Sequence, residues 1–566
     1  MSTLFLDTES DGLDWGCKAY MLAYTASETD APKVIDWRKI KLDFSRYNHF
    51  VGANTYFDTR MLGIDNPPKC DDVLVAFYCM TGKWRGLKDI AVLLGIGSKQ
   101  EQDEVINAMR QLPKFKRATF ERCITHAWMV WDVTAKYCAD DVRLTRQLYQ
   151  KFLPSGVFDD PNYLRMIEAE RNAFEQTVKG VKVGIGRACS YTETMAKRDR
   201  EIRDSVKAAY DISVSSPTQV TRSLGTKNSD AKTLERMAEE NELAAYALEF
   251  RGIQAALKVL LGELKVERVH PRISWHCVTG RASTSAPNLQ GLAGKLLAGV
   301  NVRSLIEPDN DDEVILSCDF SQIEYRIFAA QSQDSQLLKA FRDGIDVHDQ
   351  MQNTLFANLS STEKRNMLRE SCVKSAVEFP ETFKESLNFA RDEHRLGAGY
   401  IRKQSKRAVF ATMYGSSVGG LIANGYDHKV SRAIYNYFSE IKRNEWYEDL
   451  RFNWQKTGIV TTMWGRPIFS DSEHKILNYR TQGTAADTMQ EFSNDLTKYF
   501  ARTNQGRLLF TIHDECVTAT KEKNVERVTA WIKNNVSKIK FDFGYGEAVP
   551  LGVEVKVFPN RQWGIK

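Results

Sequence analysis

The sequence lacks the patterns that mark membrane, secreted and zinc-binding proteins. No apolar run approaches the roughly 18 to 20 residues that a membrane helix needs, so no membrane partner is expected. The ten cysteines are scattered singly, with no C-x-x-C pair and no Cys/His cluster at zinc spacing, which favours reduced thiols over disulfides or structural zinc. The N-terminus, MSTLFLDTESDG, reaches acidic residues within seven positions, so it does not match a secretory signal. We therefore expect a cytoplasmic protein.

The chain also lacks low-complexity tracts and internal repeats. Its 566 residues are too many for one core, so three or four structural units are expected. The formal charge of +5 is compatible with a nucleic-acid partner without indicating one. Strands and helices alternate up to about residue 150, helical periodicity dominates 161–265 and 335–460, and strands return in 270–330 and in the last hundred residues. The predicted fold class is multidomain, α/β and α+β.

Acidic residues form an ordered series in the first 150 residues. Asp7 and Glu9 flank one residue after an apolar run, so a strand would place both carboxylates on the same face. Tyr137 and Asp141 are four residues apart and would share a helix face. With Asp58, these groups could hold two divalent cations and orient a water molecule for attack on a phosphodiester, and oxygen ligands favour Mg²⁺ or Mn²⁺ over zinc. Each acid taken singly also fits a strand-end turn or a solvated surface.

Two further acids stand in apolar strands. Asp319 ends the run EVILSCD, and Asp514 lies with His513 and Glu515 inside LLFTIHDECVTA. Burying a lone carboxylate is costly unless it is paired or bound to a metal. We expect HDE to form a turn between two short strands, and the strand that carries Asp319 could lie beside them. The two aspartates could then share two metal ions.

Between these acids, two cations and two aromatic residues recur every four residues in IRKQSKRAVFATMYGSS. The four are Arg402, Lys406, Phe410 and Tyr414. A step of four rotates only about 40° round a helix, so they would form one slowly winding stripe. The cations would meet a triphosphate first and the aromatic rings would meet a sugar and base. A solvated basic helix with a core-facing aromatic end remains the alternative.

These patterns resemble two known families. The series D-x-E, N-x-x-x-D and Y-x-x-x-D resembles the tyrosine-bearing DEDD 3′–5′ exonucleases over about residues 1–150. DFSQIE, R-x-x-x-K-x-x-x-F-x-x-x-Y-G and HDE resemble the three polymerase motifs of family A DNA polymerases, as do TGRASTSAPNLQ, NYRTQGTAAD and the C-terminal LGVEVKVFPNRQWG. The resemblance implies an RNase H-like exonuclease domain followed by a right-hand polymerase domain. The implied divisions are 1–155 exonuclease, 156–270 thumb, 271–332 first part of the palm, 333–470 fingers with a helical insertion near 358–395, and 471–566 second part of the palm.

The same resemblance implies roles for individual residues. In the exonuclease, Tyr137 would orient the attacking water and the metal ligands would be Asp7, Glu9, Asp58 and Asp141. In the polymerase, Asp319 and Asp514 would bind metal, Arg402 and Lys406 would act on the phosphates, and His513 and Glu515 would support the site. Glu324 would crowd a ribose 2′-hydroxyl. Implied nucleotide contacts are Arg402, Lys406, Phe410, Tyr414, Glu324, Gln322 and His348. Implied DNA contacts are Arg281, Asn288, Gln290, Asn478, Gln482 and His513.

The implied function is a template-directed DNA polymerase with a proofreading exonuclease, replicating a bacteriophage genome by two-metal-ion nucleotidyl transfer. Each site would use two Mg²⁺ or Mn²⁺ ions. Partners would be primer–template DNA and deoxynucleoside triphosphates, and the chain would act as a monomer in the host cytoplasm, with replisome proteins left open. Two alternatives stay open: a repair or gap-filling polymerase of the same fold, and a nucleic-acid-binding protein without catalysis.

Overall fold

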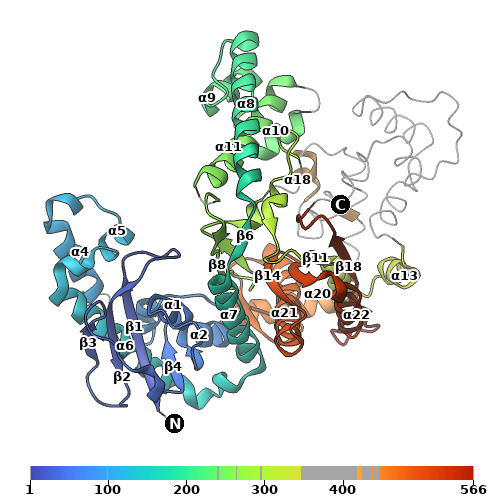
Figure 1. The fold of residues 1–566 in the computed structure, drawn as a ribbon. Coiled ribbons are helices and arrows are strands. Elements are labelled where there is room, and N and C mark those ends of the chain that lie inside the picture. The colour runs from blue at the N-terminus through green and yellow to red at the C-terminus, as the bar shows by residue number, and fades with distance from the viewer. Residues whose placement is uncertain are drawn as a thin grey trace, which may run out of the picture.

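The structure is a computed structural model that describes residues 2–98, 100–238, 241–262, 264–292, 296–345, 417–423, 432, 435–436 and 445–564. Its described part forms an N-terminal lobe, an upright helical arm and a sheet-based lobe that contains the end of the chain (Figure 1). The predicted stripe 402–414, His348 and the insertion near 358–395 lie outside the described residues. The division into thumb, palm and fingers stays a prediction.

The N-terminal lobe is built on a five-stranded mixed sheet of order β3-β2-β1-β4-β5. Its strands are β1 (Thr3–Ser10), β2 (Ala19–Thr25), β3 (Lys33–Asp36), β4 (His49–Gly52) and β5 (Lys69–Asp72). β1 pairs antiparallel with β2 and parallel with β4. Leu4 and Leu6 belong to the core on one face of the sheet and Phe5 to the core on the other, as the strand period requires. β1 continues through Asp7 and Glu9, so it is longer than the apolar run 3–6 indicates.

The described α-helices of this lobe are α1 (Thr55–Met61), α2 (Val73–Thr81), α3 (Leu87–Leu93), α4 (Gln100–Gln111), α5 (Phe120–Ile124) and α6 (Trp131–Phe152). Helices α1 and α6 pack on the sheet, and α3 and α4 pack on α6. The side chain of Asp72 caps α2 by accepting from the backbone amides of Leu74 and Val75. α2 ends at Gly82, where φ is +69° and a Cβ would come within 2.5 Å of the Phe469 backbone nitrogen. Only glycine allows this close approach between the two lobes.

The arm rises from a long connecting helix, α7 (Pro161–Lys179), which packs on the N-terminal lobe and on helix α21 (Glu473–Thr503). The helices of the arm are α8 (Ile185–Tyr210), α9 (Pro217–Leu224), α10 (Ala231–Met237) and α11 (Glu242–Gly262). α8 and α11 pack side by side. At its base, β6 (Val181–Val183), β7 (Arg268–Val269) and β10 (Ile306–Glu307) form a small sheet, next to the hairpin β8 (Arg272–Ser274) and β9 (Ser283–Ser285).

The lobe at the base of the arm holds a four-stranded antiparallel sheet of order β14-β15-β11-β18. Its strands are β11 (Glu313–Phe320), β14 (Gly506–Ile512), β15 (Glu515–Lys521) and β18 (Val553–Phe558). The accompanying elements are α12 (Ile323–Ser332), α13 (Ser335–Asp343), α18 (Val418–Ala423), α20 (Glu445–Thr457), α22 (Val525–Val536), β12 (Ile459–Thr461), β13 (Pro467–Phe469), β16 (Lys540–Phe541) and β17 (Val549–Pro550). One continuous core joins this lobe to the arm.

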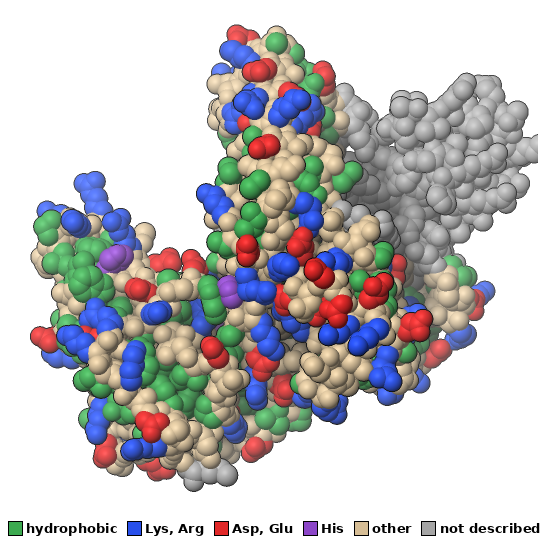
Figure 2. Space-filling view, viewed as in Figure 1, with side chains coloured by type: hydrophobic (Ala, Val, Ile, Leu, Met, Phe, Trp, Pro, Cys, Tyr) green, Lys and Arg blue, Asp and Glu red, His purple; other side chains and the backbone are tan. Residues whose placement is uncertain are grey.

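The molecular surface is hollowed between the N-terminal lobe and the arm (Figure 2). A cavity of about 420 Å³ lies between the two, lined by Arg60 of α1, Glu170 of α7 and Arg272 of β8, among others. Lys and Arg side chains are interspersed with acidic ones along the arm (Figure 2). Within the described residues, no helix is both long enough and apolar enough to cross a bilayer.

Candidate active sites

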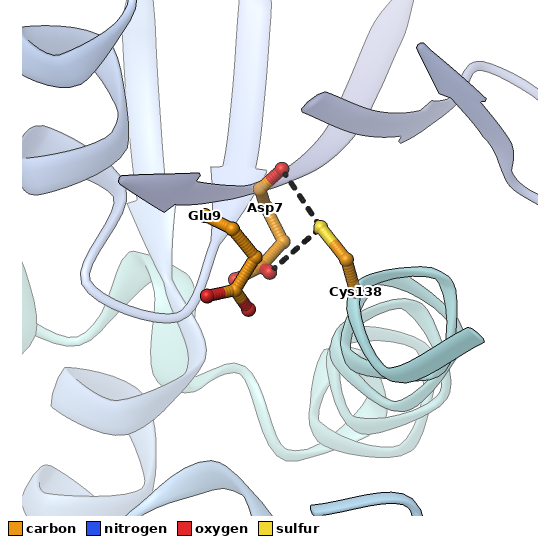
Figure 3. A group of neighbouring side chains, drawn as sticks. All are labelled: Asp7, Glu9 and Cys138. Carbon is orange, nitrogen blue, oxygen red and sulfur yellow. Dashed lines mark hydrogen bonds between the residues drawn. The ribbon is translucent and has the colours of Figure 1, made fainter. Parts of the chain in front are cut away.

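The first site lies where β1 passes α6. The carboxylates of Asp7 and Glu9 project from the same side of β1, as the strand period predicts (Figure 3). Together with the thiol of Cys138 on α6, they place ligand atoms within 4.8 Å of one another. The Cys138 Sγ lies 3.4 Å from Asp7 Oδ2 and 3.6 Å from the Asp7 carbonyl oxygen, so the thiol donates to Asp7. Sequence reasoning missed Cys138, although it stands directly after Tyr137.

Asp58 of α1 is the next carboxylate of the cluster, and its side chain is hydrogen-bonded to Thr8 of β1. Its Oδ1 accepts hydrogen bonds from the Thr8 backbone amide at 3.2 Å and the Thr8 hydroxyl at 2.7 Å. Its Oδ2 is buried and has no hydrogen-bond partner among the described residues. Burial raises the pKa of Asp58 well above its usual range, although the Thr8 hydrogen bonds lower it. A buried carboxylate oxygen without a donor suits coordination to a cation.

The opposite side of the cluster comes from α6 and α3. Tyr137 and Asp141 lie one turn apart on α6, and Lys88 of α3 places its Nζ 2.6 Å from Asp141 Oδ1 and 2.5 Å from Asp140 Oδ2. Burial raises the pKa of Asp141 to about 6, with Lys88 opposing the shift. Burial and the charge of Asp141 raise the pKa of Tyr137, so its hydroxyl stays protonated. Nothing in the sequence around Lys88 indicated a role in this site, because the aspartates that it contacts are about fifty residues away.

The cluster carries more negative charge than its described surroundings balance. Burial raises the pKa of Asp7 well above its usual range, and repulsion from Asp141, Asp58 and Glu9 adds to the shift. Burial also raises the pKa of Glu9 well above its usual range, and repulsion from Asp141 and Asp58 adds to the shift. Among the described side chains, Lys88 forms an ion pair with Asp141 of the cluster and with the neighbouring Asp140. Four carboxylates with hard oxygen donors fit divalent cations such as Mg²⁺ or Mn²⁺.

The second site lies at one end of the four-stranded sheet. β11 and β15 are neighbours, and their register pairs Asp319 with Glu515. Asp514 lies in the turn between β14 and β15, and its carbonyl oxygen accepts from the Phe320 backbone amide at 3.0 Å. The predicted adjacency of the two acid-bearing strands is therefore confirmed. The turn is shorter than predicted, since Glu515 already belongs to β15, and His513 adopts a left-handed φ of +48°.

Asp319 and Asp514 also lie near other carboxylates, which raise their pKa values further. Burial, followed by repulsion from Glu515, raises the pKa of Asp319 to about 6. Burial also raises the pKa of Asp514 to about 6, with Arg281 opposing and Glu324 reinforcing the shift. Arg281 forms an ion pair with Glu324, and its Nη2 lies 3.7 Å from Asp514 Oδ1. Both residues therefore lie beside Asp514.

Glu515 is held by residues that sequence reasoning did not single out. Its Oε1 accepts from the Ser317 hydroxyl and, at 3.3 Å, from the Trp563 indole Nε1. The Arg303 Nη1 lies 4.0 Å from its Oε2. With these partners, Glu515 is fixed beside Asp319 and shapes the charge there. The signal that could have indicated Trp563 is its place in the family-like C-terminal segment.

The part of the chain that carries the second site matches a known protein family. The sequence pattern of DNA polymerase family A matches residues 187–374 and 391–564. This chain belongs to DNA polymerase family A. DNA polymerase I of Bacillus subtilis (strain 168) is 26% identical over 390 residues, covering 62% of this chain and 40% of that protein. The thermostable DNA polymerase I of Thermus filiformis is 25% identical over 422 residues, covering 70% of this chain and 45% of that protein.

The fold agrees with this membership. The POL domain of Pol1 from M. smegmatis, solved in complex with DNA primer-template and dNTP, aligns with a TM-score of 0.71 at 18% identity, over 100% of this chain and 96% of that chain. The chain spans less than half of the length of the curated relatives it matches. The matched residues begin at 187, so the N-terminal lobe with its acidic cluster lies outside the family match.

Other predicted DNA contacts of this family A chain line the same region. Gln290 Nε2 donates to the Ala282 carbonyl at 3.1 Å and to the Thr511 carbonyl at 3.2 Å, joining the loop after β9 to β14. Asn288 Oδ1 accepts from the Gly291 amide at 3.1 Å. In this structure both side chains hold the loop, and their DNA roles stay predictions.

Two more predicted DNA contacts and one nucleotide contact lie on helices of the same lobe. Asn478 and Gln482 are half-buried one turn apart on α21, as a shared face requires. Gln322 is the left-handed residue that begins α12, with φ of +53°. The structure thus places Gln322 just before α12 and the other two residues on α21, which packs on α12 and β14. The contacts of all three with DNA and nucleotide stay predictions.

Burial of the ionised Asp319 carboxylate leads to a stability prediction for the metal-free protein. Its folded pKa of about 6 exceeds the unfolded value near 4, so ionised Asp319 destabilises the fold fully above pH 6 and not at all below about 4. In EDTA at pH 8, Asp319→Asn should therefore raise the free energy of unfolding by up to about 2 kcal/mol. The gain should shrink as the pH falls from 6 to 4. Thermal unfolding across this range measures it.

A matched control is Asp495→Asn, which changes an exposed acid on α21. It should leave stability within about 0.5 kcal/mol of wild type at every pH. A lower free energy of unfolding for Asp319→Asn than for wild type, at pH 8 without metal, would contradict the prediction that ionised Asp319 destabilises the fold.

Proposed function

We propose that this family A chain extends a DNA primer by template-directed addition of deoxynucleotides. The observation that carries the proposal is the placement of two acids at one end of the four-stranded sheet: Asp319 on β11, opposite Glu515, and Asp514 in the β14–β15 turn, whose carbonyl oxygen accepts from the Phe320 amide. Both carboxylates have raised pKa values, and hard oxygen donors with excess negative charge fit two divalent cations, Mg²⁺ or Mn²⁺. When bound, such ions lower the pKa of a primer 3′-hydroxyl and neutralise a triphosphate.

The surrounding side chains would act on the substrate directly. Glu324, whose partner Arg281 lies near Asp514, would crowd a ribose 2′-hydroxyl. Arg281 would contact the minor groove of the new base pair, where every correct pair presents an acceptor at nearly the same place. Glu515 would stay fixed by its bonds to Ser317 and Trp563. The phosphate, sugar and base contacts proposed for Arg402, Lys406, Phe410, Tyr414 and His348 fall outside the described residues.

We also propose that the N-terminal lobe is an RNase H-like 3′–5′ exonuclease. Support comes from the mixed sheet β3-β2-β1-β4-β5, which carries Asp7 and Glu9 on its central strand and meets Asp141 from α6. The Oδ2 of Asp58, which has no hydrogen-bond partner among the described residues, and the hard oxygen donors of the cluster fit two divalent ions there as well. Tyr137 would hold the attacking water through its protonated hydroxyl, and Lys88 would keep Asp141 ionised.

Primer–template DNA and deoxynucleoside triphosphates are the proposed partners of the whole chain, acting as a monomer. The structural relative from M. smegmatis was solved with both kinds of ligand. A mispaired end would have to unpair and cross between the lobes, and the cavity between α1 and β8 lies between them. Replication of a bacteriophage genome is the proposed setting, and a repair or gap-filling role fits the same geometry.

Primer extension on a mismatched primer tests both activities together. With Mg²⁺, template and all four deoxynucleotides, the wild-type chain should first shorten the primer and then extend it to the template end. A matched primer should extend directly, and EDTA should stop both reactions. Failure to extend a matched primer with Mg²⁺ or Mn²⁺ would overturn the polymerase proposal. Extension of the mismatch without prior shortening would overturn the exonuclease proposal.

A further inference from the structure

The loop Cys277–Gly280 is bonded at every carbonyl by a side chain from another part of the fold. The Cys277 carbonyl accepts from Trp84 Nε1 at 3.0 Å, and the Val278 carbonyl accepts from the Tyr78 hydroxyl at 2.8 Å. The two carbonyls that follow accept from other donors: the Thr279 carbonyl from Arg466 Nη2 at 2.8 Å and the Gly280 carbonyl from Gln490 Nε2 at 3.0 Å. Two of these four donors belong to the N-terminal lobe.

Arg466 forms hydrogen bonds both to this loop and to Tyr78 of the N-terminal lobe. It is fully buried, and besides the Thr279 carbonyl it contacts Asp487 Oδ1 at 2.6 Å and donates to the Tyr78 hydroxyl. Gly280 has φ of +80°, and a Cβ there would come within 2.8 Å of Arg466 Nη2. A buried, ion-paired guanidinium of this kind has little freedom to move, so the loop that rests on it is fixed.

Arg281 follows this loop directly. Its guanidinium pairs with Glu324 and lies 3.7 Å from Asp514 Oδ1, so the loop sets where a charged side chain stands in the polymerase site. We propose that Tyr78 of the N-terminal lobe is a positioning residue for Arg281. The exonuclease lobe thereby helps to form the polymerase site, through backbone contacts that nothing in the Tyr78 sequence context indicates. This inference rests on the proposed polymerase function.

The hydroxyl of Tyr78 has two tasks that phenylalanine cannot perform. It donates to the Val278 carbonyl and accepts from Arg466 Nη1. Tyr78→Phe keeps the ring, which stacks on Trp84 with centroids 4.1 Å apart, and removes the bonds of the hydroxyl to the Val278 carbonyl and to the buried Arg466. The loop can then relax, and Arg281 loses its fixed place beside Glu324 and Asp514.

A double-mutant cycle tests whether Tyr78 acts through Arg281. Single-nucleotide insertion is measured on primers whose terminal phosphorothioate linkage resists excision, giving kcat and KM for correct and mismatched nucleotides. Tyr78→Phe should lower kcat/KM for the correct nucleotide by about three- to tenfold and reduce its preference over a mismatch. In an Arg281→Ala background, Tyr78→Phe should cause no further loss. The Kd for primer–template, which needs no turnover, should show the same coupling.

The matched control is Tyr20→Phe, since the Tyr20 hydroxyl donates to the Ile124 carbonyl at 3.1 Å within the N-terminal lobe. It should lower the unfolding temperature about as much and leave insertion unchanged. Trp84→Phe, which removes the bond to Cys277, should behave like Tyr78→Phe. Equal loss with and without Arg281, or an equal effect of Tyr20→Phe, would overturn the inference. A wild-type chain that extends no primer would instead overturn the proposed function.

Discussion

Asp514→Ala should lower the rate of primer extension by about a thousandfold or more and leave excision of a mispaired 3′ end at the wild-type rate. Asp514 and Asp319 are the carboxylates that two divalent ions would share, and metal stabilisation of transition-state charge is worth several kcal/mol, with each 1.36 kcal/mol a factor of ten. The fold should survive, because Asp514 lies in a turn and its removal relieves unfavourable buried charge. Single-turnover extension of a matched primer measures the effect.

The control for this variant is Asp495→Ala, an exposed acid on α21 whose loss should leave extension within about twofold of wild type. Thermal unfolding should place Asp514→Ala at or above wild type in EDTA. Extension by Asp514→Ala within tenfold of wild type would show that the aspartate pair is not the reacting centre.

Asp7→Ala should have the mirror effect: excision should fall by about a thousandfold, and extension of a matched primer should stay at the wild-type rate. Asp7 shares its buried cluster with Glu9, Asp58 and Asp141. Its replacement by alanine removes one carboxylate ligand from the proposed metal site. The aspartate pair on β11 and the β14–β15 turn belongs to a different lobe and keeps all its groups. A gel-resolved digestion of a 3′-mismatched primer without nucleotides measures the loss.

Asp11→Ala serves as the control, since Asp11 is an exposed acid just after β1 whose Oδ1 accepts from the Lys18 amide. Mixing Asp7→Ala with Asp514→Ala should restore removal and extension of a mismatched primer, because each variant retains one activity and DNA can pass between molecules. Undiminished excision by Asp7→Ala would remove the N-terminal cluster from consideration as a nuclease site. Loss of both activities in either variant would argue against two separate sites.

Local spacing was enough to predict which side chains of one strand or helix share a face. A period of two placed Asp7 and Glu9 on one side of β1, and a period near four placed Tyr137 above Asp141 on α6. The acids at Asp319 and Asp514 were conspicuous because an apolar strand rarely carries an unpaired charge, and the two strands are indeed neighbours. Segment boundaries were less certain, since β1 continues through its acids to Ser10.

By itself, the sequence determined which side chains of one element share a face, Asp7 with Glu9 on β1 and Tyr137 with Asp141 on α6, because spacing along a strand or helix is a local property. Only the tertiary structure decided what surrounds them. Lys88 reaches Asp141, Trp563 reaches Glu515, and Tyr78 reaches the loop before Arg281 across long stretches of chain. These contacts depend on how whole elements pack, and side-chain period carries no information beyond its own element. The physical reason is that buried carbonyls and charges must find partners wherever packing brings donors, regardless of distance along the chain.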